Sequence, residues 1–146
     1  MIRSKAPVTV QEFGDRYTLL GPLVHKSASV EVEALEPTDP ALREAMDVLS
    51  REGVKMLYGR WLIEGGPNVL LFDHTSVTHK LNEWKGDVWK IASISTPQSD
   101  FESNDAIMLG FLVAKFLSEV RASSHALACA SVSGRLSTAD LCWCSM

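Results

Sequence analysis

Three polar residues, Asp100, Asn104 and Asp105, are the side chains of this sequence best placed to do chemistry. They stand at the start of an apolar segment that favours a helix from Asn104 to about Val120, with Ser103 as its cap. Capping is the simpler interpretation, because Asp and Asn accept hydrogen bonds from the free N–H groups of a first helical turn. The alternative is ligand contact, since a carboxylate makes charge-assisted hydrogen bonds that orient a polar ligand.

A second charged pair, Arg60 and Glu64, interrupts the apolar segment LYGRWLIEGGPNVLLFD. The two residues are four positions apart, so on an extended strand they would share one face. They could pair with charges on neighbouring segments or line the edge of a domain, and substrate binding is the alternative. The Gly65-Gly66-Pro67 stretch that follows is typical of a tight chain reversal.

The sequence has no pattern typical of a metal site. All three cysteines, Cys129, Cys142 and Cys144, lie in the last 18 residues, and a single residue separates the last two. That is not the usual zinc-ligand spacing. His74 and His79 have no cysteine or paired carboxylate beside them in a metal-ligand pattern. We therefore expect no metal and no resident cofactor, and we expect the three thiols to be free and reduced.

Length and composition indicate one globular domain: 146 residues, 46% of them hydrophobic and 22% charged. The net charge of -4, with lysines and arginines spread singly, argues against a nucleic-acid surface. The longest apolar run, Ala106 to Leu117, is interrupted by Lys115 and is too short to span a bilayer. The first 13 residues, MIRSKAPVTVQEF, have no apolar h-region, so we expect no secretory signal. We therefore expect a cytoplasmic protein without nucleic-acid or membrane partners.

The segments that must position the polar residues alternate between strand-like and helix-like patterns, which predicts an α/β fold. The predicted strands are a buried strand at Tyr17–Leu20, a peripheral strand at Val30–Ala34, and two neighbouring strands at Val54–Ile63 and Val69–Phe72. The predicted helices are a short turn at Val10–Phe13, opened by a Thr9–Glu12 capping box and closed by Gly14, and a helix capped by Asp39 and stopped by Gly53. A helix through Val77, Leu81 and Trp84 that ends near Gly86, and the helix from Asn104, complete the set. The predicted inner face of that last helix consists of Ile107, Gly110, Phe111, Ala114 and Leu117, widened by Phe101, Leu109 and Phe116.

The character of the sequence changes after Val120. The segment RASSHALACASVSGRLSTADLCWCSM is rich in serine and alanine and has no clear periodicity. We therefore divide the chain into a folded part over residues 1–121 and a divergent tail over residues 122–146. We predict that the last helix frays near Val120 to Arg121 and that Ser123 to Met146 is largely disordered, because such a segment buries little apolar surface.

The segment LYGRWLIEGGPNVLLFD is similar to a segment of the animal and fungal glycogen (starch) synthases. Five flanking segments agree with that family in the same order: IRSKAPVT, YTLLGP, VEALEP, LNEWKGDVW and NDAIMLGFL. The resemblance covers roughly Ile2 to Val120 without obvious gaps. Because its tryptophans and glycines stay in register over that length, it is much more specific than a lone glycine-rich triplet.

The resemblance implies an incomplete Rossmann-like N-terminal domain of a GT-B glycosyltransferase, with an irregular C-terminal tail. Such an enzyme binds UDP-glucose between two domains and transfers glucose, with retention and without a metal, to the non-reducing end of an α-1,4-glucan. The resemblance also implies glycogen and the primer protein glycogenin as partners, and a homo-oligomer for the intact enzyme. Asp100, Asn104 and Asp105 match the family pattern Pro-x-x-Asp-x-x-x-Asn-Asp.

The sequence departs from the family at both ends. The family's Lys-Val-Gly-Gly loop before IRSKA, its His-Phe-His-Glu-Trp stretch after the last helix, and its second domain have no counterpart in this sequence. Two interpretations follow: a fragment of glycogen synthase that is inactive alone, or a non-catalytic module that binds glycogenin. In both, we expect no catalytic residue here, and the candidate substrate-binding residues are Asp100, Asn104, Asp105, Arg60 and Glu64.

Overall fold

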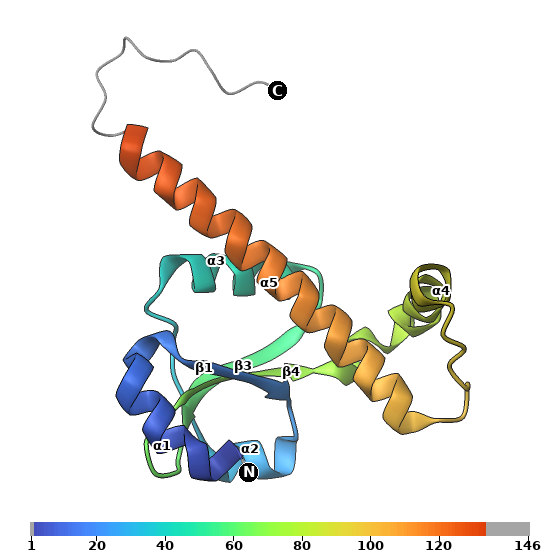
Figure 1. The fold of residues 1–146 in the computed structure, drawn as a ribbon, viewed down its shortest axis with the longest axis horizontal. Coiled ribbons are helices and arrows are strands. Elements are labelled where there is room, and N and C mark those ends of the chain that lie inside the picture. Colours follow the sequence, from blue (N-terminus) through green and yellow to red (C-terminus); the bar gives the residue numbers. More distant parts are fainter. Residues whose placement is uncertain (1, 134–146) are drawn as a thin grey trace.

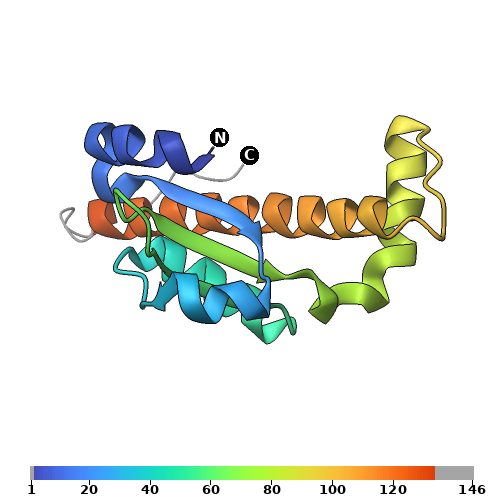
Figure 2. The same cartoon turned by 90° about the horizontal axis from the view of Figure 1, so that it is seen from below.

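The computed structural model describes residues 2–133, which form a four-stranded sheet with helices on both faces. Helices α1 (Ile2–Phe13) and α2 (His25–Glu31) lie on one face of the sheet (Figure 1). Helices α3 (Pro40–Arg51) and α5 (Phe101–Ser133) lie on the other, and the view from below shows β1 crossing in front of α5 (Figure 2). The predicted α/β class is confirmed.

The sheet is mixed, with strand order β1-β4-β3-β2. Its strands are β1 (Thr18–Pro22), β2 (Val32–Ala34), β3 (Lys55–Trp61) and β4 (Asn68–Asp73). Strand β3 runs antiparallel to both β4 and β2, whereas β1 and β4 are parallel. In that parallel pair Pro22 lies opposite Phe72, so the carboxyl ends of the two strands are side by side.

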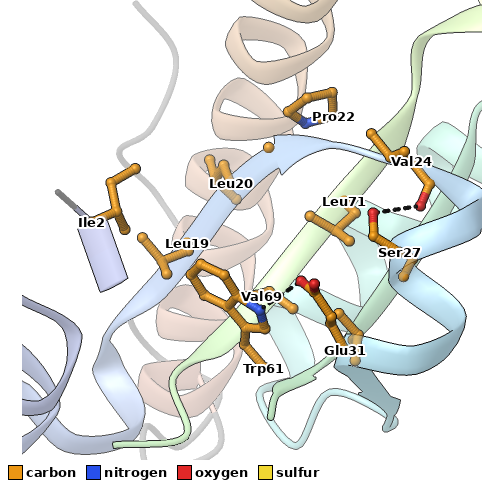
Figure 3. A pocket seen from close by; sticks show the side chains of 13 residues that line it. Ile2, Leu19, Leu20, Pro22, Val24, Ser27, Glu31, Trp61, Val69 and Leu71 are labelled. Atoms are coloured by element: carbon orange, nitrogen blue, oxygen red, sulfur yellow. Dashed lines mark hydrogen bonds between the residues drawn. The ribbon is translucent and has the colours of Figure 1, made fainter. Parts of the chain in front are cut away.

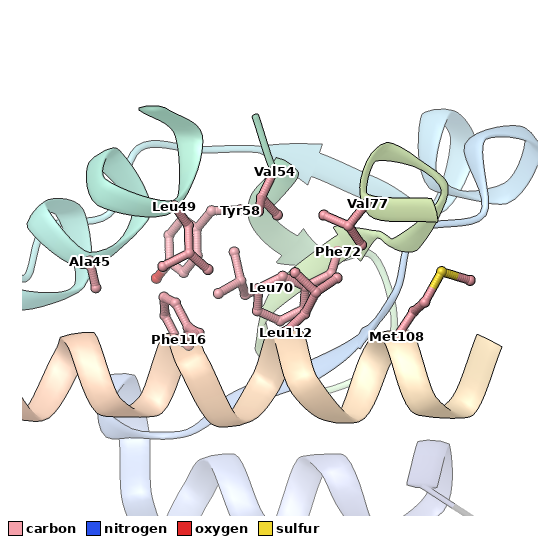
Figure 4. Packing of buried hydrophobic residues seen from close by; sticks show 10 residues of the cluster. All are labelled: Ala45, Leu49, Val54, Tyr58, Leu70, Phe72, Val77, Met108, Leu112 and Phe116. Carbon is pink, nitrogen blue, oxygen red and sulfur yellow. The ribbon is translucent and has the colours of Figure 1, made fainter. Parts of the chain in front are cut away.

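The hydrophobic core fills the space between the sheet and helices α3 and α5 (Figure 4). Phe72 from β4 meets Phe116 from α5 in an edge-to-face contact, with ring centroids 5.6 Å apart. The buried members of the core are Ala45, Leu49, Val54, Tyr58, Leu70, Phe72, Val77, Met108, Leu112 and Phe116.

The helix predicted between Asp39 and Gly53 is confirmed as α3. The backbone N–H of Ala41 donates to Asp39 Oδ1 at 2.9 Å, and Pro40 occupies the first helical position. Beyond the other end, Gly53 has a φ of 88°, which a residue with a side chain adopts only under strain. The sequence signals for both ends of this helix were therefore sufficient.

Strands β3 and β4 are neighbours joined by a tight reversal, as predicted. Gly65 has a φ of 89°, and a Cβ added to it would lie 2.7 Å from Pro7 Cα. The turn therefore packs directly on α1. Strand β3 ends at Trp61, earlier than predicted, so Glu64 lies in the turn. The expectation that Arg60 and Glu64 share a strand face is wrong, because the chain has already begun to reverse.

The first helix is longer than predicted, and its capping box is wrong. Helix α1 begins at Ile2, and the hydroxyl of Thr9 donates to the carbonyl oxygen of Lys5 at 3.0 Å. Thr9 is thus an interior residue of the helix. Helix α1 ends before Gly14, which has a φ of 57°, as predicted. A short 3-10 turn, η1 (Gly14–Arg16), then leads into β1, which is half-buried and includes Gly21 and Pro22.

Helix α2 was not predicted, and it contains Val30 and Glu31, two residues assigned to a strand. Val30 is exposed, so the alternation of valine and glutamate marks a short helix followed by β2. The prediction that this strand is peripheral is confirmed, since β2 is at an edge of the sheet.

Helix α4 (Leu81–Ala92) runs through Gly86, where the sequence predicted its end. It follows a 3-10 turn, η2 (His74–Lys80), which contains Val77. The helix ends instead at Ser93, the residue with a left-handed φ of 55°. A Cβ on Gly86 would meet nothing within 4 Å, so this glycine is an ordinary helix-interior position.

The inner face of α5 differs in part from the predicted one: Phe116 is buried as predicted, whereas Leu117 and Phe101 are not. Met108, Leu112 and Phe116 are buried at spacings of four residues, whereas Leu117 and Phe101 are 52% and 79% exposed. The helix is apolar on most of its circumference, so periodicity alone did not identify the face that meets the sheet.

Helix α5 continues to Ser133 and extends away from the sheet (Figure 1). The predicted fraying near Val120 to Arg121 is therefore wrong, and so is the predicted disorder as far as Ser133, because an alanine-rich segment has high helix propensity. The rest of the predicted tail, with Cys142 and Cys144, lies outside the described residues. Cys129 is exposed and free, as expected. No helix of the described part is long and apolar enough to cross a bilayer.

Candidate functional site

Polar side chains from four elements, β4, α2, η2 and α5, meet at the carboxyl ends of the parallel strands β1 and β4. Asp73 is the last residue of β4, and its Oδ2 lies 3.5 Å from His25 Nε2 at the start of α2. The next residue, His74, places its Nε2 3.3 Å from Asp105 Oδ1 in the first turn of α5. With Asn104, these residues form what we call the carboxyl-edge cluster. In α/β sheets, ligands commonly bind outside the carboxyl ends of the strands.

Asp73 is buried and anchors this cluster. Its Oδ1 accepts hydrogen bonds from the Thr75 hydroxyl at 2.5 Å and from the Thr75 N–H at 3.1 Å. The Thr75 hydroxyl is the main reason why the pKa of Asp73 lies below its ordinary value; the Thr75 amide and His25 lower it further, against the opposing effect of burial. The carboxylate is therefore ionised, and it caps the turn that follows β4.

Two buried polar atoms of the cluster have no hydrogen-bond partner among the described residues: His74 Nδ1 and Asn104 Oδ1. Asn104 Nδ2 donates to the Gln98 carbonyl oxygen at 3.4 Å, so its Oδ1 is the unused acceptor. If His74 Nε2 carries the proton and donates to Asp105, its Nδ1 is an acceptor as well. An acceptor left without a donor in the interior costs about 1–3 kcal/mol. With that tautomer of His74, both unpartnered atoms are acceptors that lack a donor.

The three residues at the start of α5 have different surroundings. Asp100 caps the helix: its Oδ2 accepts from the Ser103 hydroxyl at 2.5 Å and its Oδ1 from the Ser103 N–H at 3.4 Å. The Ser103 hydroxyl is the main cause of the lowered pKa of Asp100. The predicted cap, Ser103, is therefore the donor to the actual cap. Asn104 is buried, and Asp105 faces His74 from the surface.

Arg60 and Glu64 lie away from this cluster. Arg60 is exposed on β3 and pairs in register with Asn68, the first residue of β4, whereas the cluster contains the last residue of that strand. Glu64 is exposed in the β3–β4 turn. The structure thus brings together two of the five sequence candidates, Asn104 and Asp105, with Asp100 next to them as a cap.

Three residues of the cluster were missed by the sequence analysis: His25, Asp73 and His74. A signal existed for two of them, because Asp73 and His74 directly follow the apolar run Val69–Phe72, and polar residues after a buried strand mark its ligand-binding end. His25 carried no such signal, since the helix that presents it was not predicted. In the described part of the chain, no three His, Cys, Asp or Glu side chains are grouped so as to hold a metal ion.

The opposite face of the sheet carries an apolar pocket of about 220 Å³ between α2 and the strands (Figure 3). Leu19, Val69 and Leu71 form its floor. The indole N–H of Trp61 donates to Glu31 Oε2 at 3.4 Å across one end. Val24 lies at the rim and is 56% exposed. This pocket contains few polar groups and differs in character from the carboxyl-edge cluster.

The fold places the chain among α/β proteins, with a cluster of polar side chains at the carboxyl ends of two parallel strands. Residues 1–139 match the family model of glycogen synthase, and the chain belongs to that family. The match extends beyond Val120, where the sequence resemblance was judged to end.

Curated relatives agree with this assignment. Over 119 residues the chain is 56% identical to glycogen [starch] synthase of Neurospora crassa, covering 82% of the chain and 17% of that protein. It is 46% identical over 137 residues to glycogen [starch] synthase isoform 1 of Saccharomyces cerevisiae, covering 87% of the chain and 19% of that protein. It is 42% identical over 120 residues to the liver glycogen [starch] synthase of Rattus norvegicus, covering 82% of the chain and 17% of that protein. The chain thus spans less than a fifth of the length of these relatives.

Proposed function

We propose that the chain is part of the Rossmann-like N-terminal domain of a GT-B glycogen synthase. That enzyme transfers glucose from UDP-glucose, with retention, to the non-reducing end of an α-1,4-glucan. The observation that carries the proposal is membership of the glycogen synthase family. Since the chain spans less than a fifth of its relatives, the proposal assigns it one part of the reaction and no catalytic residue. Residues 1–121 are the proposed domain portion, residues 122–146 are the tail, and a homo-oligomer is proposed for the intact enzyme.

Within that reaction, the carboxyl-edge cluster binds hydroxyl groups of the glucan. Its free groups are mostly acceptors: the carboxylate of Asp105, His74 Nδ1 and Asn104 Oδ1. A polyol supplies the donors that these atoms lack, and hydrogen bonds to a carboxylate are the strong ones.

The charge of the cluster favours the glucan over the donor's diphosphate. Asp73 and Asp105 of the cluster, and the neighbouring cap Asp100, each contribute a formal negative charge at pH 7. A diphosphate would meet repulsion there, whereas a neutral sugar would not. UDP-glucose is therefore proposed to be held elsewhere in the intact enzyme.

A chimera tests this role. The aligned 119-residue segment of the Neurospora crassa enzyme is replaced by that of this chain, and Asp105→Asn is introduced. We expect kcat/KM for the glucan to fall about tenfold, because a charge-assisted hydrogen bond is lost, with an unchanged KM for UDP-glucose and an unchanged melting temperature. The matched control is Asp87→Asn, which alters an exposed pair with Lys90 on α4. Unchanged glucan kinetics, or a fall in melting temperature alone, would contradict the role.

We also propose a second function, binding of glycogenin, on the basis of the apolar pocket between α2 and the sheet. Its floor is made of aliphatic side chains, and exposed Val24 extends it outward. Val24→Asp should weaken binding of glycogenin to the chain at least tenfold by calorimetry, because a charge would enter an apolar contact. Val8→Asp, at an exposed position on α1 outside the pocket lining, is the control. Equal affinities of the two variants would refute the pocket as the binding site.

A further inference from the structure

Lys85 is the only buried residue of helix α4, which is unusual for a lysine. Its exposed fraction is 8%, whereas Trp89 and Ile91 of the same helix are 57% and 83% exposed. A buried ammonium group loses its hydration, and proteins normally compensate for this loss with a carboxylate partner. Lys85 has no such partner, because none of the ion pairs in the described part of the chain includes it.

The ammonium group of Lys85 donates instead to a backbone oxygen, that of Pro97, at 2.9 Å. Pro97 lies in the connection between α4 and α5, residues 93–100, which contains no helix or strand. The next carbonyl oxygen along this connection, that of Gln98, accepts from Asn104 Nδ2 at 3.4 Å. Among the described residues, Lys85 and Asn104 make the only side-chain hydrogen bonds to residues 94–99. The two side chains therefore hold adjacent carbonyl groups.

Lys85 also lies close to the start of α5. The Ser103 hydroxyl is the main cause of the lowered pKa of Asp100, and the positive charge of Lys85 contributes to the same effect. The packing of the two helices has a separate source, since the ring of Trp84 stacks on Phe111 of α5 with centroids 5.1 Å apart. Lys85 is thus placed to hold the connection rather than to join the helices.

We propose that Lys85 is a positioning residue for the carboxyl-edge cluster. By fixing the carbonyl group of Pro97, it sets the adjacent carbonyl group of Gln98 and, through it, the side-chain amide of Asn104. Asn104 Nδ2 is thereby occupied, and Asn104 Oδ1 stays free to accept from a ligand hydroxyl. The inference rests on the proposed function, which supplies that ligand. Lys85 acts through Asn104 and needs no contact with the ligand.

A positioning role and a merely structural role predict different effects of Lys85→Met. Methionine has a similar length but removes the charge and the donors. Replacing a buried charge by an apolar side chain of similar size is often neutral or stabilising, and the contact between Trp84 and Phe111 is retained. We therefore expect an unchanged or higher melting temperature together with weaker glucan binding. A merely structural lysine would give a lower melting temperature and unchanged kinetics in the folded enzyme.

The test uses the Neurospora crassa chimera. Lys85→Met should raise the KM for the glucan about tenfold, as expected for the loss of one charge-assisted hydrogen bond, with an unchanged KM for UDP-glucose. The backbone amides of residues 94–104 should exchange with deuterium faster, as measured by mass spectrometry. Lys85→Arg keeps the charge and a donor and should restore both properties. The matched control is Lys90→Met, at an exposed position of the same helix, which should change neither.

A double-mutant cycle shows whether Lys85 acts through Asn104. In an Asn104→Ala background, Lys85→Met should cause no further rise in the KM for the glucan, because the side chain that Lys85 positions is absent. Additive effects of the two substitutions would overturn the inference. A KM that rises in Asn104→Ala but not in Lys85→Met would also overturn it, as would unchanged deuterium exchange at residues 94–104 in Lys85→Met.

The proposed function can fail separately. If Lys85→Met speeds exchange at residues 94–104 while neither Lys85→Met nor Asn104→Ala alters the KM for the glucan, the positioning of Asn104 by Lys85 stands. The glucan-binding role of the carboxyl-edge cluster would then be wrong.

Discussion

Asp73 contacts more of the candidate site than any other residue of the carboxyl-edge cluster. It ends β4, accepts two hydrogen bonds from Thr75 in the following turn, and lies beside His25 of α2. Because His74 follows it directly, the position of His74 opposite Asp105 depends on the same turn. A change at Asp73 should therefore affect stability first and the site second.

Asp73→Asn should lower the free energy of unfolding at pH 7 by about 1–3 kcal/mol, since hydrogen bonds to a buried charged acceptor are weakened. The folded-state pKa is lowered, so the ionised carboxylate stabilises the fold above its unfolded pKa of about 3.9 and loses this effect as the pH falls through the folded pKa. The difference between parent and variant should therefore shrink on acidification. Urea unfolding at pH 7 and pH 3 measures it.

The exposed Asp87→Asn variant is the control and should differ from the parent by less than about 0.5 kcal/mol. If Asp73→Asn lowered the free energy of unfolding by the same amount at both pH values, its effect would come from the shape of the new side chain rather than from the lost charge.

At the residue level, the sequence predicted part of the candidate site for a clear reason. Asn104 and Asp105 were recognised because a helix start is a local pattern. His74 was considered only as a metal ligand, and its contact with Asp105 joins residues 31 positions apart, which no local pattern encodes. The unpartnered Nδ1 of His74 is likewise a consequence of packing.

At the level of elements, the β3–β4 turn depends on the absence of side chains. Gly65→Ala should destabilise the fold by more than about 1 kcal/mol, because its φ is 89° and the new Cβ would lie 2.7 Å from Pro7 Cα. Gly86→Ala is the matched substitution: it is in the interior of α4 with open space around it, and it should stabilise by roughly 0.5–1 kcal/mol. Thermal melts of both variants test this. If the melting temperatures of the two variants moved in the same direction, the assigned roles of Gly65 in the turn and Gly86 in the helix interior would be contradicted.

Helix α5 is held to the sheet by Met108, Leu112 and Phe116, of which the sequence pattern identified only Phe116. Leu112→Ala should cost about 2–5 kcal/mol, because Leu112 is 1% exposed in the core. Leu117→Ala, on the face predicted from the sequence, should cost less than about 1 kcal/mol, because Leu117 is 52% exposed. Denaturant unfolding of both variants distinguishes the faces, and a larger loss at Leu117 would favour the original prediction.

The elements predicted best are those with explicit end signals. Asp39, Pro40 and Gly53 defined α3, and Gly65-Gly66-Pro67 defined the hairpin. The elements predicted worst lack such signals or contain misleading ones. Gly86 resembled a helix stop, but α4 continues through it, and a Cβ added there would meet nothing within 4 Å. Helix α2 has no side-chain cap at its start, so the sequence contained no start signal from which to predict it.

At the level of the whole molecule, much apolar surface remains uncovered in the described part of the chain. Trp89, Ile91, Ile94 and Phe101, around the α4–α5 connection, are each more than half exposed, and β1 is an edge strand. Large exposed apolar patches and open strand edges promote association. We therefore predict that the purified chain self-associates, as light scattering after size exclusion would show. A variant with Ile91→Lys and Phe101→Lys should associate less. A monodisperse monomer with a sharp cooperative melt would contradict the prediction.

The central claim is that this chain forms part of a working glycogen synthase. The most direct measurement is glucosyl transfer from UDP-glucose to glycogen by the Neurospora crassa chimera carrying the 119 aligned residues of this chain, which are 56% identical to those replaced. We predict a kcat/KM within about tenfold of the parent enzyme, because a change of 1.4 kcal/mol in transition-state stabilisation corresponds to that factor. A chimera that folds with the parent's melting temperature but shows no transfer would contradict the claim.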